Sequence, residues 1–122
     1  MQHHPSANSA TGTVDLDRRP ILVFWESTRA CLLKCAHCRA VAQPTPAPGE
    51  LTTQEAMAFI DSLAAFDKPA PILVVTGGDA LMRPDLSQLI SHARAQGVHV
   101  ALSPSVTPLL TDERLAELRE VG

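Results

Sequence analysis

The chain has three cysteines, and all of them fall within residues 31–38, at Cys31, Cys35 and Cys38. This spacing keeps the three sulfur atoms within one short segment of chain. Three thiolates from one loop can ligate three irons of a [4Fe-4S] cluster, whereas an electron-transfer cluster of that type takes four cysteines. The spacing therefore favours a cluster with one iron left open for another ligand.

Three other interpretations of the cysteines have to be weighed. On a helix, all three sulfurs would share one face and could be small buried hydrophobes. With His37, the thiolates could bind structural zinc, although the adjacency of His37 and Cys38 makes joint ligation of one ion awkward. Cys35 and Cys38 also form a C-x-x-C pair after an apolar run, as in thioredoxin-like thiol oxidoreductases. The cysteines alone leave these alternatives open.

A second motif follows the apolar run at residues 72–75, where the chain continues as Thr-Gly-Gly-Asp. Gly77 and Gly78, at the end of a strand, would let the backbone approach a ligand closely. The carboxylate of Asp79 could accept hydrogen bonds from an ammonium group. Gly-Gly-Asp alone is typical of any turn between a strand and a helix. Its place at the strand end that follows the cysteine loop favours one shared site.

With both motifs, residues 20–122 resemble the radical S-adenosylmethionine superfamily. The cysteine motif of the family is C-x3-C-x2-C, commonly preceded by a threonine at the position of Thr28. Its second motif is Gly-Gly-Glu, where residues 77–79 read Gly-Gly-Asp. With the Arg-Pro-Asp-Leu at 83–86, the chain is most similar to SPASM-type peptide maturases and to enzymes of haem and haem d1 synthesis.

The resemblance implies a metal centre and a reaction. Cys31, Cys35 and Cys38 would ligate a [4Fe-4S] cluster, and the amine and carboxylate of S-adenosylmethionine would chelate the fourth iron. The backbone at His37 would contact the adenine. One electron from the reduced cluster would cleave a carbon–sulfur bond, giving methionine and a 5′-deoxyadenosyl radical that abstracts hydrogen from a substrate.

The resemblance also implies residues that contact the cofactor. Gly77, Gly78 and Asp79 would meet the methionyl ammonium, and the shorter aspartate either weakens this contact or is accommodated by a small shift of the loop. Ser103 and Ser105 follow the third predicted strand, in a loop that approaches the cofactor or substrate in relatives. As ordinary turn residues, the two serines would instead make local hydrogen bonds.

Short apolar runs at 20–25, 72–75 and 98–102 are typical of buried strands in a parallel sheet that is covered by helices. The cysteine loop, the Gly-Gly-Asp motif and the serine loop each follow one of these runs. In open α/β sheets, ligands bind at the carboxyl ends of the strands. The three loops are therefore expected on one side of the sheet.

Helices are expected between and after the strands. Thr52 and Glu55 have the spacing of a capping box. An apolar stripe over residues 86–93 predicts a second helix, and Gly97 is suited to end it. Thr111 has the character of an N-cap for a third helix.

A βα unit of a barrel takes about thirty residues, so residues 20–122 hold three units. The superfamily core is typically a partial barrel of six units. The expected fold is therefore α/β: the N-terminal three βα units of a partial TIM-type (βα)6 barrel, truncated, after a flexible tail at 1–19. Such a chain should bind S-adenosylmethionine weakly and turn over poorly alone, and the missing C-terminal half of the barrel becomes a candidate partner.

Composition indicates which cellular compartment and which classes of partner suit the chain. The net charge of −3, one Trp, three Phe and no Tyr provide no basic surface and few stacking platforms for nucleic acid. The apolar runs are too short to span a membrane, and the thiols without a signal peptide favour the cytoplasm. The resemblance implies an electron donor such as flavodoxin or ferredoxin, and a small-molecule or peptide substrate, with a tetrapyrrole as the alternative to a peptide.

Overall fold

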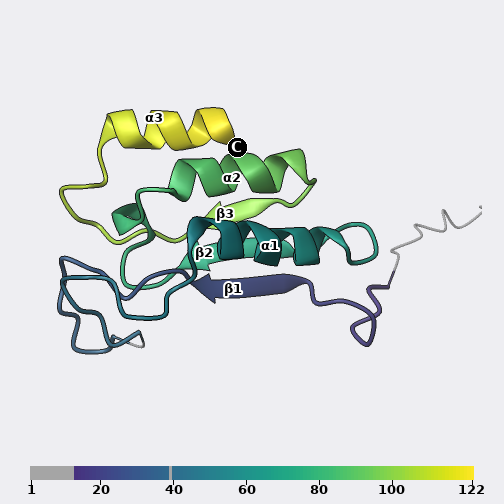
Figure 1. Cartoon of the computed structure of the whole chain (residues 1–122), viewed down its shortest axis with the longest axis horizontal. Helices are drawn as coiled ribbons and strands as arrows, with labels where there is room; N and C mark the ends of the chain where they lie inside the picture. The colour runs from purple at the N-terminus through teal and green to yellow at the C-terminus, as the bar shows by residue number, and fades with distance from the viewer. Residues whose placement is uncertain (1–12, 39) are drawn as a thin grey trace, which may run out of the picture.

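The computed structural model describes residues 13–38 and 40–122. Its core is a three-stranded parallel sheet in the order β1-β2-β3, followed and connected by helices (Figure 1). The elements in chain order are β1 Leu22–Glu26, α1 Thr53–Ala64, β2 Ile72–Thr76, the 3-10 helix η1 Ala80–Met82, α2 Leu86–Ala95, β3 Val100–Leu102 and α3 Asp112–Val121. Each strand leads to an α-helix, which confirms the predicted α/β class with three successive βα units.

α1 and α2 lie on one face of the sheet, and α3 packs on α2 (Figure 1). Val23 and Trp25 of β1 join the core with residues of α1 and α2, whereas Leu22 and Phe24 on the opposite face are 47% and 67% exposed. In a TIM-type barrel the helices form an outer ring, so coverage of one face is consistent with the expected partial barrel. Consecutive strand order with right-handed crossovers brings every helix to the same side of a parallel sheet.

The helix boundaries follow the local signals in the sequence. The Thr52 hydroxyl accepts the Glu55 N–H at 3.2 Å and the Glu55 carboxylate accepts the Thr52 N–H at 3.1 Å, so the capping box is confirmed. Gly97 follows α2 with a φ of +80°, and the Thr111 hydroxyl caps α3 by accepting the Arg114 N–H. Local side-chain chemistry sets these boundaries.

The strand boundaries differ slightly from those expected. The third strand begins at Val100 rather than at residue 98, because the Val98 N–H donates to the carbonyl of Ala93 at the end of α2. Of the predicted tail at 1–19, only residues 13–19 are described, and there Arg18 forms an ion pair with Asp67 at 2.7 Å. Among the described residues, no helix is long and apolar enough to cross a membrane.

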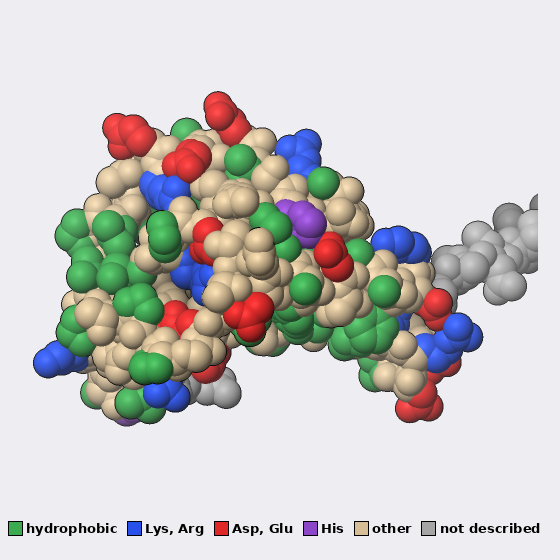
Figure 2. Space-filling model, in the orientation of Figure 1, with side chains coloured by type: hydrophobic (Ala, Val, Ile, Leu, Met, Phe, Trp, Pro, Cys, Tyr) green, Lys and Arg blue, Asp and Glu red, His purple; other side chains and the backbone are tan. Residues whose placement is uncertain are grey.

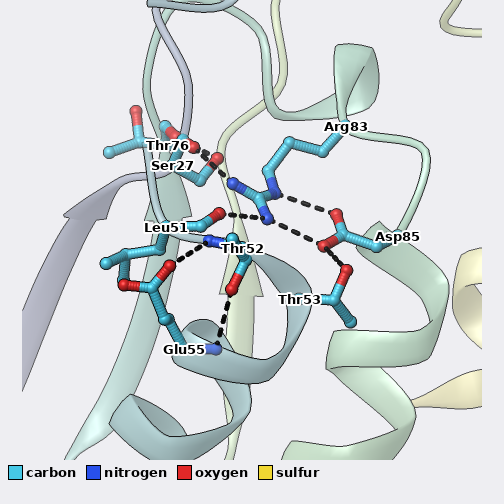
Figure 3. A network of polar contacts seen from close by, with 8 residues as sticks. All are labelled: Ser27, Leu51, Thr52, Thr53, Glu55, Thr76, Arg83 and Asp85. Carbon is cyan, nitrogen blue, oxygen red and sulfur yellow. Dashed lines mark hydrogen bonds and ion pairs between the residues drawn. The ribbon is translucent and has the colours of Figure 1, made fainter. Parts of the chain in front are cut away.

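A buried arginine ties three elements together behind the strand ends (Figure 3). The Arg83 guanidinium donates to the carbonyl of Ser27 at 2.8 Å and to the carbonyl of Leu51 at 3.1 Å. It also forms a two-pronged ion pair with Asp85, whose Oδ2 additionally accepts the Thr53 hydroxyl at 2.7 Å. The end of β1, the start of α1 and the start of α2 are thereby held in one arrangement.

Removal of this guanidinium should cost more stability than removal of an exposed one. In Arg83→Met, the Asp85 carboxylate and two backbone carbonyls lose their donor, and breaking a buried ion pair costs about 3–5 kcal/mol. Exposed Arg119→Met should change the free energy of unfolding by less than about 0.5 kcal/mol. Urea unfolding of both variants measures the difference, and equal stabilities would contradict this role of Arg83.

The same ion pair predicts a pH dependence. Burial raises the pKa of Asp85, but the hydrogen bonds from Arg83 and Thr53 outweigh it and hold the pKa below its ordinary value of 3.8. Because the folded pKa is the lower one, the carboxylate stabilises the fold above pH 3.8, and this contribution is lost as the pH falls through the folded pKa.

Asp85→Asn should therefore be less stable than the parent chain at pH 7, and the gap should narrow as the pH falls below 3.8. Urea unfolding at a series of pH values measures the gap directly. Other carboxylates titrate equally in both proteins, so they cancel in the difference. Native carboxylates have mostly titrated by roughly pH 2.5. A difference in the free energy of unfolding that stays constant down to that pH would contradict the prediction.

Candidate functional site

A cavity of about 600 Å³ lies at the carboxyl ends of β1 and β2, next to the uncovered face of the sheet. It brings together most of the site residues expected from the sequence, namely Cys31, Cys35, Cys38, His37, Gly77, Gly78 and Ser105. The loops at this end also carry exposed hydrophobic residues such as Leu32, Val41 and Val106. Figure 2 shows hydrophobic side chains gathered over the same end of the molecule.

The cysteine loop and the glycine motif are joined by backbone hydrogen bonds beyond the ends of the strands. They run from the Ser27 N–H to the Thr76 carbonyl at 2.8 Å, from the Gly78 N–H to the Thr28 carbonyl at 2.6 Å, and from the Asp79 N–H to the Ala30 carbonyl at 2.8 Å. Segments 27–30 and 76–79 therefore lie against each other as a continuation of the parallel ladder. This contact places the first cysteine beside the glycines.

Both glycines are required by this close approach. A Cβ atom at Gly77 would lie 2.5 Å from the carbonyl oxygen of Thr28, and one at Gly78 would lie 2.5 Å from that of Ala30. Gly77 also has a φ of +139°, a conformation that residues other than glycine rarely adopt. The absence of a Cβ at Gly77 and Gly78 therefore lets the start of the cysteine loop pack against them. The two glycines also line the cavity.

The base of the cysteine loop is closed by a second set of contacts. The Cys31 N–H donates to the carbonyl of Gln43 and the Gln43 N–H donates to that of Arg29, both at 2.9 Å. The Glu50 carboxylate accepts the N–H groups of Arg29 and Ala47. Burial raises the pKa of Glu50, but these hydrogen bonds outweigh it and lower the pKa below its ordinary value.

The three sulfurs differ in their surroundings. Cys31 is buried, and its Sγ accepts the Leu33 N–H at 3.4 Å. Cys38 is half-buried, and its Sγ accepts the Ala42 N–H at 3.3 Å. Cys35 is exposed. Two of the three sulfurs are thus held by the backbone, with the third at the open side of the loop.

The structure argues against two of the alternatives. Residues 31–38 form no helix, so the cysteines do not lie on a buried helical face. Cys35 and Cys38 are linked by a turn, in which the Cys38 N–H donates to the Cys35 carbonyl at 3.2 Å. A thioredoxin-type pair gains its reactivity at a helix N-terminus, and among the described residues no helix begins before Thr53.

The donor set fits an iron–sulfur cluster better than zinc. Within the described ranges, no three His, Cys, Asp or Glu side chains converge on one metal position. Structural zinc needs four ligand atoms within about 2.0–2.3 Å of one ion. A [4Fe-4S] cluster is instead ligated by separate cysteines on separate irons, so its thiolates surround a larger object. Three thiols around a cavity of about 600 Å³ meet that requirement.

Asp79 is the site residue that lies differently from the expectation. Its side chain is fully buried and does not line the cavity. Oδ1 accepts the N–H groups of Leu81 and Ser105, and Oδ2 accepts the hydroxyl of Thr107 at 3.3 Å. The carboxylate thus caps η1 and anchors the β3–α3 loop. Both carboxylate oxygens therefore bind protein donors, away from the cavity lining.

The remaining expected residues separate clearly. His37 is exposed and lines the cavity, whereas Ser103 is exposed outside it and donates its N–H to the Val75 carbonyl at 3.0 Å. Sequence reasoning missed Glu26 and Thr76, which are paired in register at the ends of β1 and β2 and line the cavity. Strand alternation places both on the uncovered face and would have been the signal.

Comparison with known proteins agrees with the site. The model of the Radical SAM superfamily, whose members use a [4Fe-4S] cluster and S-adenosylmethionine, matches residues 25–122. An AdoMet-dependent heme synthase of Oleidesulfovibrio alaskensis is 48% identical over 83% of this chain and 25% of its own length.

Two further relatives extend the comparison. An AdoMet-dependent heme synthase of Nitratidesulfovibrio vulgaris is 40% identical over the whole chain and 32% of its own length. A PqqA peptide cyclase of Bradyrhizobium diazoefficiens is 35% identical over 84% of the chain and 26% of its own length. The chain therefore spans about a quarter to a third of these curated relatives. The resemblance seen in the motifs is confirmed, and the chain belongs to the radical SAM superfamily.

Proposed function

We propose that this chain forms the cluster-binding and cofactor-binding part of a radical SAM enzyme. The observation that carries the proposal is the joint cavity, in which all three cysteines meet Gly77 and Gly78. The backbone ladder between segments 27–30 and 76–79 supports it, because it fixes the two motifs relative to each other through hydrogen bonds of the chain itself. The site is thus preorganised for a group that touches both motifs.

Cys31, Cys35 and Cys38 would ligate three irons of the cluster. When bound, the cluster supplies the electron that cleaves S-adenosylmethionine to methionine and a 5′-deoxyadenosyl radical, which abstracts hydrogen from a substrate. The chain holds two of the thiolates with backbone N–H groups, from Leu33 and Ala42. Hydrogen bonds to the sulfurs are among the factors that set the potential of such a cluster.

The cofactor would be oriented by backbone rather than by charged side chains. Because the Asp79 carboxylate is engaged inside the fold, the methionyl ammonium would meet carbonyl oxygens of segment 77–79. The substitution of aspartate for the glutamate of the family then leaves the ammonium contact intact. The backbone at His37, which lines the same cavity, would contact the adenine.

The substrate we propose is a tetrapyrrole. The heme synthases that match at 48% and 40% identity favour it over a peptide, which the peptide cyclase at 35% identity represents. Because the chain spans about a quarter to a third of these relatives, we assign full turnover to an assembly that also contains the rest of a barrel. A cytoplasmic flavodoxin or ferredoxin would supply the electron.

Anaerobic reconstitution with iron and sulfide tests the proposed function. We expect about four irons per chain, and an electron paramagnetic resonance signal that shifts when S-adenosylmethionine is added. Single Cys→Ser replacement at each of the three positions should remove most of the iron, whereas Ser103→Ala, outside the cavity, should not. One zinc without sulfide would favour a structural zinc module, and a reversible disulfide without iron would favour a thiol oxidoreductase.

A glycine substitution tests the close approach of the two motifs. In Gly78→Ala, the new Cβ would lie 2.5 Å from the Ala30 carbonyl oxygen, so the cysteine loop must move. We expect a loss of about 1–3 kcal/mol in the free energy of unfolding, together with loss of most of the reconstituted iron.

Gly49→Ala is the matched control, since its Cβ would meet no atom within 4 Å although its φ is +82°. This variant should keep the full iron content and show only the cost of backbone strain. Urea unfolding and iron analysis measure both effects. Full iron content in Gly78→Ala would contradict the close approach.

A further inference from the structure

Ser105 lies at the junction of the two motifs although it comes from a third loop. It follows β3, and its N–H donates to Oδ1 of Asp79 at 3.4 Å. Its hydroxyl donates to the carbonyl of Gly78 at 2.9 Å and lies 3.7 Å from Sγ of Cys31. The fully buried Asp79 thus holds the backbone of Ser105, and the hydroxyl reaches the first cysteine of the loop.

The hydroxyl has one proton and two acceptors within reach. A free thiol at Cys31 can donate to the oxygen of Ser105, but a thiolate bound to iron has no proton and can only accept. The proton of Ser105 is then shared between the Gly78 carbonyl and the Cys31 sulfur. In the described part of the chain, every other hydrogen bond to a cysteine sulfur comes from a backbone N–H, at Leu33 and Ala42.

We propose that Ser105 is a positioning residue that donates a hydrogen bond to the Cys31 thiolate and raises the reduction potential of the cluster. The proposal rests on the proposed function, since it requires a cluster on Cys31. Reduction adds one electron, supplied by dithionite in a titration, and it breaks no bond. A hydrogen bond to sulfur stabilises the more negative, reduced state more than the oxidised state, so its loss makes reduction harder.

The arrangement also links the potential to the cofactor. The Gly78 carbonyl has two lone pairs, so an ammonium group could bind beside the Ser105 hydroxyl and weaken the hydrogen bond that this oxygen makes with it. A larger share of the hydroxyl proton would then be available to the Cys31 sulfur, and the cluster would become easier to reduce with the cofactor in place. The side chain thereby couples occupancy of the glycine motif to the electron affinity of the metal centre.

The test is a potentiometric titration of the reconstituted chain, monitored by electron paramagnetic resonance, without and with S-adenosylhomocysteine. At the midpoint of the parent chain, Ser105→Ala should show a reduced-to-oxidised ratio lowered by about three- to tenfold, where tenfold corresponds to 59 mV for one electron. Ser105→Thr, which keeps the hydroxyl, should retain the parent midpoint. Ser103→Ala is the control outside the cavity.

S-adenosylhomocysteine carries the ammonium group but no cleavable sulfonium, so it probes the coupling without turnover. It should raise the midpoint more in the parent chain than in Ser105→Ala. An equal upward shift in both would overturn the coupling, and an unchanged midpoint in Ser105→Ala with full iron content would overturn the whole proposal.

Ser105→Val provides a second comparison, because it differs from Ser105→Thr only in a methyl group that replaces the hydroxyl. If variants without the hydroxyl lose the cluster while Ser105→Thr keeps it, the hydroxyl acts on the fold through Gly78, and the redox role is overturned. If the parent chain itself takes up no iron–sulfur cluster, the proposed function fails first, and that result is distinct from an unaltered midpoint.

Discussion

The close approach of two backbone segments is the constraint on which the site depends. Segments 27–30 and 76–79 continue the β1–β2 ladder past the strands, and this is sterically allowed only because residues 77 and 78 have no Cβ. The first cysteine follows directly from the held segment. The glycine motif thus allows the close packing of the cysteine loop, and this packing places the motif where it can contact a ligand.

Helices pack on one face of the sheet, and the candidate site lies next to the other face. α1 and α2 cover one face, where Arg83 ties Ser27 at the end of β1 to the starts of both helices. The opposite face is uncovered and ends in Glu26 and Thr76, which line the cavity. The contacts on the helix-covered face hold the strand ends in place. The loops next to the uncovered face therefore present thiols and backbone groups in fixed positions.

Local patterns explain what the sequence predicted correctly. The capping box at Thr52, the stop at Gly97 and the cap at Thr111 depend on residues a few positions apart, and all are found in the structure. The cysteine and glycine motifs were recognisable because their spacing is fixed by one local loop and one strand end. Membership of the radical SAM superfamily followed from these motifs.

What the sequence could not predict depends on distant parts of the chain. The orientation of Asp79 is decided by Ser105 and Thr107, which come from the loop after the next strand. An apolar strand has the same sequence pattern whether one face or both are covered, so the 67% exposure of Phe24 does not follow from its own strand. The sequence predicts Ser105 near a cofactor, but its contact with the Cys31 sulfur depends on how the loop after β3 folds toward the cysteine loop.

The central claim is that three cysteines hold a cluster whose fourth iron stays open beside the glycine motif. Mössbauer spectroscopy of the chain reconstituted with ⁵⁷Fe tests it most directly. The account predicts that S-adenosylmethionine changes the signal of one iron in four and leaves those on Cys31, Cys35 and Cys38 little altered. Because the chain alone should bind S-adenosylmethionine weakly, the cofactor is added in large excess. Four irons whose signals all stay unchanged under that condition, or iron bound without sulfide, would contradict the account.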